Sequence, residues 1–434
     1  MEAQSLVVVG MQWGDEGKGK VIDLLSSQAK HIARAQGGNN AGHTIVANGI
    51  EYRFHLIPSG ILYPSTRCYI GGGTVIDPAS ILAEMEALRS HNVQFEHRLF
   101  ISPYAHVVLP YHKLLDQLSE QRKGKASIGT TGKGIGPCYV DKVQRIGIRM
   151  IDLIDSQRLT QCLEATLPLK NEELQKIYNH AGISFEEIYS TYEAFGRSLH
   201  QFVAPVEEML FEASLNKEKI LFEGAQGALL DVSFGTYPYV TSSCTLAGGA
   251  SAGFGFGPSR LGHVIGATKA YTTRVGNGPF PSELKEDELC LFPDHHASRE
   301  IGTTTGRKRR MGWLDVALLR HTVCLNGADS LAIMKLDILD QVKEIKICIG
   351  YKIRGKIVRT FPASLNELDL AEPIYESHPG WLSSIRDVST YGNLPPNAKA
   401  YLRRIEELLN LPISLISVGP EREKTIWMDH FYGS

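Results

Sequence analysis

The chain has 434 residues, enough for two or three domains or for one large α/β domain with excursions. Its 45 Lys and Arg nearly balance its 47 Asp and Glu, and the formal net charge is -2. This balance argues against a protein dedicated to nucleic acid or to a membrane surface. Because the start has no signal-peptide pattern and no apolar run reaches the ~18 residues of a membrane span, we expect a cytoplasmic protein with no membrane partner.

The seven cysteines are scattered along the chain and include no C-x-x-C pair. An odd number of cysteines without such pairs suits a reducing compartment better than a disulfide framework or a zinc site. We therefore expect free thiols packed in the core.

The first apolar run leads into a glycine-rich segment, residues 10–20, with the sequence Gly-Met-Gln-Trp-Gly-Asp-Glu-Gly-Lys-Gly-Lys. Such a turn from strand to helix can cradle phosphate with backbone N–H groups, a helix N-terminus and a lysine. The spacing from Gly14 to Lys20 matches a Walker loop, but Val21 stands where Ser or Thr would bind magnesium. Asp15 is then the nearest candidate ligand for magnesium. Phosphate binding explains the acid and the lysines better than a purely structural turn does.

Short apolar runs separated by amphipathic stretches recur along the chain, at residues 6–9, 220–222, 331–334 and 413–416. This alternation predicts an α/β fold with a large, mostly parallel central sheet flanked by helices. Glycine nearly vanishes between residues 151 and 219, where Leu, Glu and Lys dominate. We therefore expect one domain over residues 1–434, with a helical subdomain at about 151–219 inserted within it.

Two further glycine-rich segments resemble ligand-binding loops. Residues 36–44 include His43, which the sequence leaves open between a functional histidine and a surface one. Asn48-Gly49 then predicts a hairpin turn and an antiparallel excursion from the sheet. Residues 127–137 combine glycines, hydroxyls and a lysine. This pattern suits a second phosphate site, and a flexible surface loop is the alternative.

Arginines stand beside threonines in two later segments, residues 272–276 and 302–310. Arginine binds carboxylate or phosphate with two parallel hydrogen bonds, so a small anionic substrate is favoured. The basic run 307–310 could also be a nuclear signal or a nucleic-acid patch. The absence of other basic blocks argues against that alternative.

Lys335 and Asp337 follow an apolar run, in the sequence Lys-Leu-Asp. A fixed carboxylate can accept hydrogen bonds from both N1–H and the 2-amino group of guanine, while a lysine stem covers the ring. An aspartate in this position can also simply cap a helix. Residues 416–420 close another expected strand with a loop that could meet the same base.

Taken together, these segments resemble the adenylosuccinate synthetase family. The likeness runs in order from Val7 to about Gly419. Its motifs are the first glycine-rich loop, Asn-Ala-Gly-His-Thr, Gly-Thr-Thr-Gly-Lys-Gly-Ile-Gly-Pro, Glu-Gly-Ala-Gln-Gly, Tyr-Pro-Tyr-Val-Thr-Ser-Ser, Thr-Thr-Gly-Arg, Lys-Leu-Asp and Ser-Val-Gly-Pro. The resemblance implies a fold similar to that of P-loop NTPases.

The resemblance also implies an activity, that of a carbon–nitrogen ligase. Such an enzyme joins IMP to L-aspartate, with GTP as co-substrate and Mg²⁺ as cofactor, in the first committed step of AMP synthesis from IMP. Because the purine 6-oxygen is a poor leaving group, a phosphoryl group is first placed on it, and the amine of aspartate then displaces phosphate. The products are adenylosuccinate, GDP and phosphate.

The resemblance assigns roles to individual residues. Asp15 would take the proton from the purine lactam and bind magnesium together with the Gly42 carbonyl, and His43 would act as acid toward the GTP phosphates. Lys18 and Gln226 complete the expected catalytic set. The expected GTP contacts are Gly14, Asp15, Glu16, Gly17, Lys18, Gly19, Lys20, Gly42, His43 and Thr44 at the phosphates, and Lys335, Asp337, Ser417 and Gly419 at the guanine.

The resemblance further implies a homodimer in which Arg145 reaches the IMP site of the other subunit. The remaining IMP contacts are expected at Asn40, Thr131, Gln226, Thr241 and Arg307. The aspartate contacts are expected at Val275, Thr304, Thr305, Arg307 and Arg309.

Four residues depart from the family pattern, namely Asn39 in place of His, Lys133 and Lys308 in place of Arg, and Met334 in place of Thr. None of them removes a reacting group, so they bear on substrate affinity. Two other classes share parts of the pattern. A nucleotide kinase would leave the carboxylate site at residues 305–309 without purpose, and a GTP-switch protein would not need the second phosphate loop or the pair Asp15 and His43.

Overall fold

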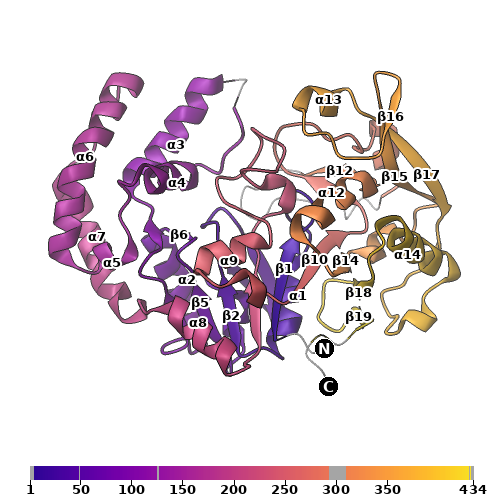
Figure 1. Cartoon of the computed structure of the whole chain (residues 1–434), viewed down its shortest axis with the longest axis horizontal. Coiled ribbons are helices and arrows are strands. Elements are labelled where there is room, and N and C mark those ends of the chain that lie inside the picture. The colour runs from indigo at the N-terminus through magenta and orange to yellow at the C-terminus, as the bar shows by residue number, and fades with distance from the viewer. Residues whose placement is uncertain (1–3, 48, 125–126, 293–308, 430, 432–434) are drawn as a thin grey trace.

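The structure is a computed structural model that describes residues 4–47, 49–124, 127–292, 309–429 and 431. Its centre is a nine-stranded sheet (Figure 1). The strand order is β19 (Thr425–Trp427), β18 (Ile413–Ser417), β14 (Ser330–Met334), β10 (His263–Lys269), β1 (Ser5–Gly10), β9 (Ile220–Glu223), β2 (His31–Arg34), β5 (Arg67–Ile70) and β7 (Leu99–Ile101). Neighbouring strands are parallel except β19, which is antiparallel to β18. The predicted mostly parallel sheet is confirmed, and so are strands at the four apolar runs.

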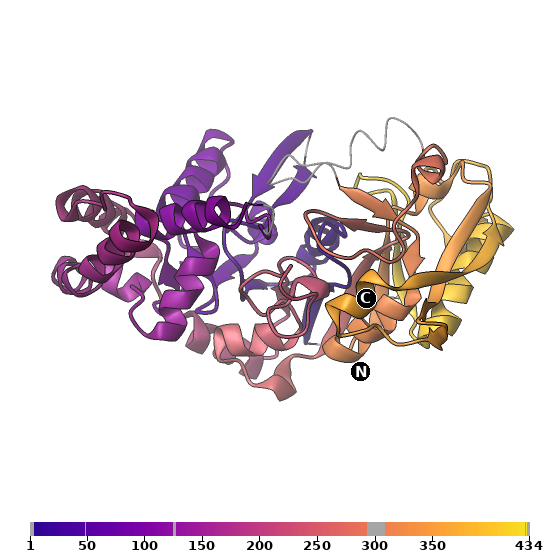
Figure 2. The ribbon, with the colours of Figure 1, turned by 90° about the horizontal axis from the view of Figure 1, so that it is seen from above.

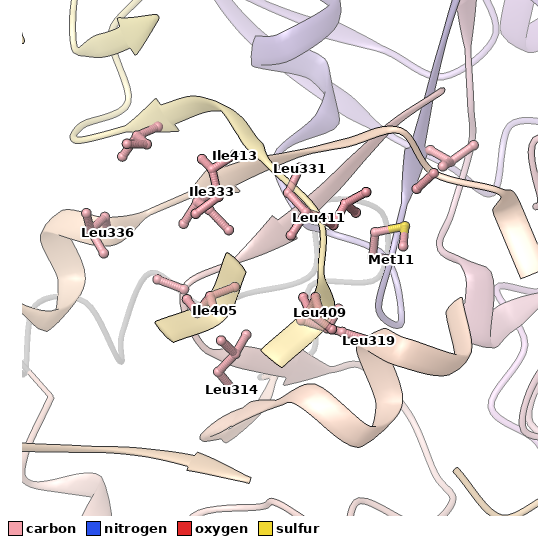
Figure 3. Packing of buried hydrophobic residues seen from close by; sticks show 14 of the residues in the cluster. Met11, Leu314, Leu319, Leu331, Ile333, Leu336, Ile405, Leu409, Leu411 and Ile413 are labelled. Atoms are coloured by element: carbon pink, nitrogen blue, oxygen red, sulfur yellow. The ribbon is translucent and has the colours of Figure 1, made fainter. Parts of the chain in front are cut away.

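Strand β1 lies at the centre of the sheet and is buried on both faces, which explains its continuous apolar sequence. Because side chains alternate along a strand, Leu6 and Val8 pack into one core and Val7 and Val9 into the other. Figure 3 shows part of the core that contains Val7 and Val9. There, residues of β14 and β18 pack against side chains from the helices that cover this face of the sheet.

Helices cover both faces of the sheet. One core contains residues of α1 (Lys18–Ser26), α2 (Pro78–Ser90) and α3 (Pro110–Lys123). The other contains residues of α8 (Val206–Leu215), α9 (Gly248–Phe254), α12 (Val316–Asn326) and α14 (Pro396–Leu409). The expected flanking helices are thus present.

The segment predicted as helical, residues 151–219, contains α5 (Met150–Leu153), α6 (Ser156–Tyr178), α7 (Phe185–Leu199) and α8. Helices α6 and α7 lie together at one end of the molecule, with α3 and α4 (Ile135–Gln144) between them and the sheet (Figures 1 and 2). The Asp155 carboxylate caps α6 by accepting hydrogen bonds from two backbone N–H groups. The division of the chain into domains stays a prediction.

The antiparallel excursions are small sheets outside the central one. The predicted hairpin joins β3 (His43–Ala47) to β4 (Ile50–Phe54), and Gly49 in its turn has φ 76°. At the end of the molecule opposite α6, β15 (Glu344–Ile353) pairs with β16 (Lys356–Val358) and β17 (Glu372–Pro379) (Figure 2). The remaining elements are β6 (Val75–Ile76), β8 (His106–Val107), β11 (Thr272–Arg274), β12 (Arg310–Gly312), β13 (Leu314–Asp315), α10 (Glu286–Leu289), α13 (Leu365–Asp369) and the 3-10 helices η1 (Ser59–Leu62), η3 (His200–Phe202), η4 (Ala228–Leu230), η5 (Pro258–Arg260), η6 (Leu336–Leu339) and η7 (Tyr391–Asn393).

The strand order reverses around β1. From β1 the chain builds β2, β5 and β7 on one side, and later adds β10, β14 and β18 on the other. In α/β sheets ligands bind outside the carboxyl ends of the strands at such a switch point. The loops that follow β1, β9 and β10 therefore meet where a ligand site is expected.

Two expectations from composition have different outcomes. All seven cysteines are free, but Cys244, Cys290 and Cys324 are exposed, so the expectation that every thiol is packed in the core is wrong. No helix in the described part of the chain is long and apolar enough to cross a membrane. A cytoplasmic location stays a prediction.

Candidate active site

A cavity of about 630 Å³ lies at the switch point of the sheet. It brings together residues that are far apart in the sequence, and most of the residues predicted for the site line it. These are Gly14, Asp15, Gly17, Lys18, Gly19, Lys20, Asn40, Gly42, His43, Thr44, Thr131, Gln226, Thr241, Val275, Arg309, Lys335, Asp337, Ser417 and Gly419. One cavity is thus shared by the loops assigned to the GTP phosphates, IMP, aspartate and guanine.

The loop after β1 takes the shape of a phosphate cradle. Gly14 and Gly17 have φ values of 86° and 93°, and Gly17 is the N-cap of α1. Glu16 is fully buried and does not line the cavity, because its carboxylate accepts hydrogen bonds from the backbone N–H groups of Gln12 and Gly14, both at 2.9 Å. Lys18 lines the cavity and forms an ion pair with Glu16 at 2.7 Å. Glu16 therefore stabilises the conformation of the loop through hydrogen bonds to the loop's own backbone.

Asp15 adopts a left-handed backbone with φ 59°, which is uncommon outside glycine. Its carboxylate accepts a hydrogen bond from Nε of Arg309 at 2.7 Å. Gln226 and Lys335, two other residues predicted for the site, also have φ 59°. Backbone strain of this kind concentrates at functional sites, and here it occurs in three separate loops around one cavity.

His43 is held by a carboxylate that the sequence assignment did not include. Its Nδ1 lies 2.6 Å from Oε1 of Glu223, the last residue of β9. The Ser59 backbone N–H donates to the other oxygen of Glu223 at 2.9 Å. Burial of Glu223 disfavours its charge, but His43, Arg34 and the Ser59 N–H outweigh that effect and hold its pKa below the usual value. The sequence feature that could have indicated Glu223 is an acidic residue at the end of an apolar strand.

A polar network forms the side of the cavity assigned to IMP. Nε2 of Gln226 donates to Oδ1 of Asn40 at 3.0 Å, and Nδ2 of Asn40 donates to Oγ1 of Thr241 at 3.2 Å. Oε1 of Gln226 is buried and has no hydrogen-bond partner within the described part of the chain. A buried acceptor left open in a cavity is suited to a ligand that donates a hydrogen bond.

The second glycine-rich loop lines the cavity through Gly129, Thr130 and Thr131. The Glu120 carboxylate accepts hydrogen bonds from the backbone N–H groups of Gly129 and Thr130, at 2.8 and 3.2 Å. Gly129 and Thr130 are therefore held at the cavity wall, which argues against the alternative of a flexible surface loop at this point. Whether they bind phosphate stays a prediction.

The loops assigned to guanine follow β14 and β18. Lys335 is the N-cap of η6, and Asp337 lies within that helix, so the alternative of a capping aspartate does not hold. Ser417 is buried, and its hydroxyl accepts a hydrogen bond from Nζ of Lys20 at 2.8 Å. Lys20 therefore joins the phosphate loop to this end of the cavity.

Arg274 is a buried cavity residue to which the resemblance assigned no role. Its guanidinium lies 4.7 Å from the ring centre of Trp13, and its Nη2 donates to Oγ1 of Thr236 at 3.1 Å. Burial and the neighbouring Arg310 lower the pKa of Arg274 to about 9. The sequence feature that indicated Arg274 is Thr-Thr-Arg, because an arginine among threonines suggests an anion site.

Some predicted residues are not brought to the cavity. Arg145 is exposed at the C-terminal end of α4 and lines a separate hollow of about 490 Å³ with other basic side chains. Thr304, Thr305, Arg307 and Lys308 lie outside the described residues. The site assignments as a whole stay predictions.

The other three departures from the family pattern lie at or beside the cavity. Asn39 is buried, and its side-chain amide donates to Asp77 at 3.1 Å. Nζ of Lys133 donates to the Asn39 carbonyl at 2.8 Å, which links the second loop to the segment before His43. Met334 lines the cavity against Gly17.

Comparisons with known proteins agree on one family. The family model described as adenylosuccinate synthetase matches residues 7–426. The chain is 52% identical to the adenylosuccinate synthetase of Caldanaerobacter subterraneus subsp. tengcongensis over 98% of its own length and 99% of that protein. It is 49% identical to that of Heliobacterium modesticaldum over 97% and 98% of the two chains. The structure resembles that of fully ligated adenylosuccinate synthetase from Plasmodium falciparum, with a TM-score of 0.92, 37% identity and coverage of 98% and 100%.

Proposed function

The chain belongs to the adenylosuccinate synthetase family, and we propose that its central cavity joins IMP to L-aspartate with GTP as the phosphoryl donor. The reaction forms adenylosuccinate, GDP and phosphate through 6-phosphoryl-IMP, and it commits IMP to AMP synthesis. The observation that carries the assignment to this cavity is that Asp15, His43, Arg309 and the network of Asn40, Gln226 and Thr241 all line it.

The order of the chemistry follows from the reactivity of the purine. Deprotonation of the lactam by Asp15 makes the 6-oxygen nucleophilic, so that it can attack the γ-phosphoryl group of GTP. His43 donates a hydrogen bond to the departing phosphate chain and stabilises its negative charge. The amine of aspartate then attacks C6, and phosphate leaves from a carbon that would otherwise have to release oxide or hydroxide.

The contacts around Asp15 support this arrangement of substrates. Arg309 is assigned to the carboxylate of aspartate, and it contacts Asp15 directly at 2.7 Å. The two substrates that must react would therefore be held by neighbouring side chains, which raises their effective concentration. Asn40, Thr131, Gln226 and Thr241 would hold IMP. Val275 would position the aspartate, a role shared with Thr304, Thr305 and Arg307.

Magnesium fits the oxygen donors of this site. Among the described residues no group of three or more His, Cys, Asp or Glu could hold a metal ion by itself. Mg²⁺ is commonly bound by one or two protein oxygens together with substrate phosphates and water. Asp15 and Gly42, whose carboxylate and carbonyl oxygens would bind the ion, line the same cavity. When bound there, magnesium supplies charge stabilisation for the transferring phosphoryl group.

We further propose that the active unit is a homodimer in which Arg145 completes the IMP phosphate site of its partner. Arg145 is exposed and lies away from the cavity of its own chain. A guanidinium presented on the outer surface could serve a second copy. Its contribution would be a charge-assisted contact to phosphate.

The test is to incubate the protein with GTP, Mg²⁺ and IMP, with and without L-aspartate, and to measure adenylosuccinate and GDP. Formation of adenylosuccinate that depends on aspartate, with one GDP for each product molecule, is the expected result. GDP formation with IMP but without any dependence on aspartate would instead indicate a nucleotide kinase. GTP binding without turnover would indicate a switch protein.

A further inference from the structure

Lys20 ends the phosphate-loop motif, but its side chain reaches the other end of the nucleotide site. Nζ of Lys20 donates to the hydroxyl of Ser417 at 2.8 Å, to the carbonyl of Gly419 at 2.8 Å and to the carbonyl of Lys424 at 2.9 Å. An ammonium group has three donors, so these acceptors use all of them. No donor of Lys20 is left for a phosphate while these bonds persist.

The three acceptors all belong to residues 417–424, which begin at the last residue of β18 and are here called the C-terminal loop. The loop folds around the ammonium, because Ser417 Oγ donates to the Gly419 carbonyl at 2.9 Å and the Val418 N–H donates to the Lys424 carbonyl at 3.0 Å. Lys20 therefore fills the centre of the loop that carries two predicted guanine contacts.

Helix α1 holds the C-terminal loop at a second point. The buried carboxylate of Asp23 pairs with the guanidinium of Arg422, with Nη2 to Oδ1 at 2.6 Å. Lys20 and Asp23 stand three positions apart, so they lie on the same side of α1. The helix that begins in the phosphate loop thus presents a cation and an anion to one loop.

We propose that Lys20 is a positioning residue for guanine recognition, which holds the C-terminal loop against α1 and so sets nucleotide selectivity. This inference rests on the proposed function, because Ser417 and Gly419 are assigned there to guanine. It revises the sequence-based assignment of Lys20 to the phosphates, and it leaves Lys18 and the backbone N–H groups of the loop for them. The motif then couples the two ends of the nucleotide site.

The charge on Lys20 is compatible with this role. Burial lowers the pKa of Lys20 to about 8, and the neighbouring carboxylates of Asp337, Glu421 and Glu423 oppose the decrease. At neutral pH the group therefore remains an ammonium with three donors.

The test separates base recognition from phosphate recognition. We would measure the binding of guanosine and of inorganic tripolyphosphate to Lys20→Met by calorimetry, with Mg²⁺ and saturating IMP so that guanosine cannot occupy the IMP site. Methionine keeps the unbranched stem and removes the ammonium. The expected result is a loss of guanosine affinity of about tenfold or more, the size of one charge-assisted hydrogen bond, with tripolyphosphate affinity unchanged within about twofold. Weaker tripolyphosphate binding with unchanged guanosine binding would overturn the proposal.

Lys424→Met is the matched control, because it removes the same charge from the same loop. Its side chain pairs with the exposed Asp387, whereas only its backbone contacts Lys20. Both affinities should stay within about twofold of the wild type. A loss of guanosine binding as large as that of Lys20→Met would mean that net charge, and not the contacts of Lys20, decides the effect.

Two more variants keep the outcome decisive. If circular dichroism shows that Lys20→Met does not fold, Arg422→Met takes its place. This variant removes the ion pair between Arg422 and Asp23, and Arg422 is partly exposed. A selective loss of guanosine binding in Arg422→Met supports the proposal, and unchanged guanosine binding overturns it. Asp337→Asn tests the guanine site itself. If this variant binds guanosine normally, the assignment of the guanine site fails, which is distinct from failure of the Lys20 proposal alone.

Discussion

At the scale of single residues, the proposed reaction depends first on Asp15, the proposed base. Asp15→Asn keeps the size of the side chain but removes the proton acceptor and a charged ligand for magnesium. Turnover should fall by at least ~10², the low end of general-base effects. Steady-state kinetics with saturating substrates is the measurement, and Asp369→Asn at the end of α13 is a control with the same chemical change at an exposed position. Turnover close to that of the wild type would remove Asp15 from the mechanism.

Glu223 gives a second prediction at this scale. Its carboxylate lies 2.6 Å from Nδ1 of His43 and so fixes the orientation of the ring. Glu223→Gln keeps an acceptor but loses the charge that stabilises a protonated ring. We expect kcat to fall by roughly tenfold, with little change in the KM for IMP, because a supporting residue of this kind acts on chemistry more than on binding. A rise in KM at constant kcat would assign Glu223 to substrate binding.

At the scale of elements, Glu84 predicts how stability changes with pH. It lies on α2 and accepts hydrogen bonds from the backbone N–H groups of Leu56 and Ile57, which ties the helix to the chain after β4. Burial raises the pKa of Glu84 from 4.5 to about 7, although these hydrogen bonds oppose the increase. Between those pH values the folded protein keeps the proton and the unfolded chain releases it. Stability contributed by Glu84 is therefore lost as pH rises from 4.5 to about 7.

The measurement compares the free energy of unfolding of the wild type and of Glu84→Gln, whose side chain does not titrate. As pH rises through this range, the free energy of unfolding of the wild type should decrease relative to that of Glu84→Gln, by on the order of 3 kcal/mol at most. Above pH 8 the difference in free energy of unfolding should no longer vary with pH. A difference that does not vary with pH would show that Glu84 has an ordinary pKa.

Elements and loops differ in how far the sequence could predict them. Continuous apolar runs such as residues 6–9 predicted buried parallel strands, because both faces of such strands are covered. The glycine-rich loops were also recognised, since only a few residue types allow a positive φ. The hydrogen-bond and ion-pair partners of the charged side chains, in contrast, could not be predicted from the sequence. The contact of Lys20 with Ser417 spans 397 positions and depends on the order of strands in the sheet, which no local pattern encodes.

Glu16 shows the same limit within one loop. The motif placed an acid among glycines and lysines, and the resemblance assigned it to the nucleotide. In the structure the carboxylate turns inward and accepts the N–H groups of its own loop. A short segment can satisfy its backbone groups with its own side chains, and the sequence does not indicate which acid does so. Asp15, one position earlier, faces the cavity instead.

At the scale of the whole molecule, the proposed dimer predicts complementation between two defective chains. Arg145→Leu should raise the KM for IMP by one to two decades, the loss of one charge-assisted phosphate contact. In a mixed dimer of Arg145→Leu with Asp15→Asn, one site would carry both lesions and the other neither. Activity should therefore reappear on mixing two nearly inactive proteins. No recovery, after mass spectrometry has shown subunit exchange, would mean that each chain completes its own site.

The proposed mechanism requires that the cavity around Asp15 activates the 6-oxygen of IMP by phosphorylation before aspartate displaces it. The direct measurement uses IMP labelled with ¹⁸O at position 6, together with GTP, Mg²⁺ and L-aspartate, and analyses the released phosphate by mass spectrometry. This mechanism predicts one ¹⁸O atom in the phosphate for each adenylosuccinate formed. Unlabelled phosphate, with the ¹⁸O recovered in water, would contradict it, because the oxygen would then have left without ever bonding to phosphorus.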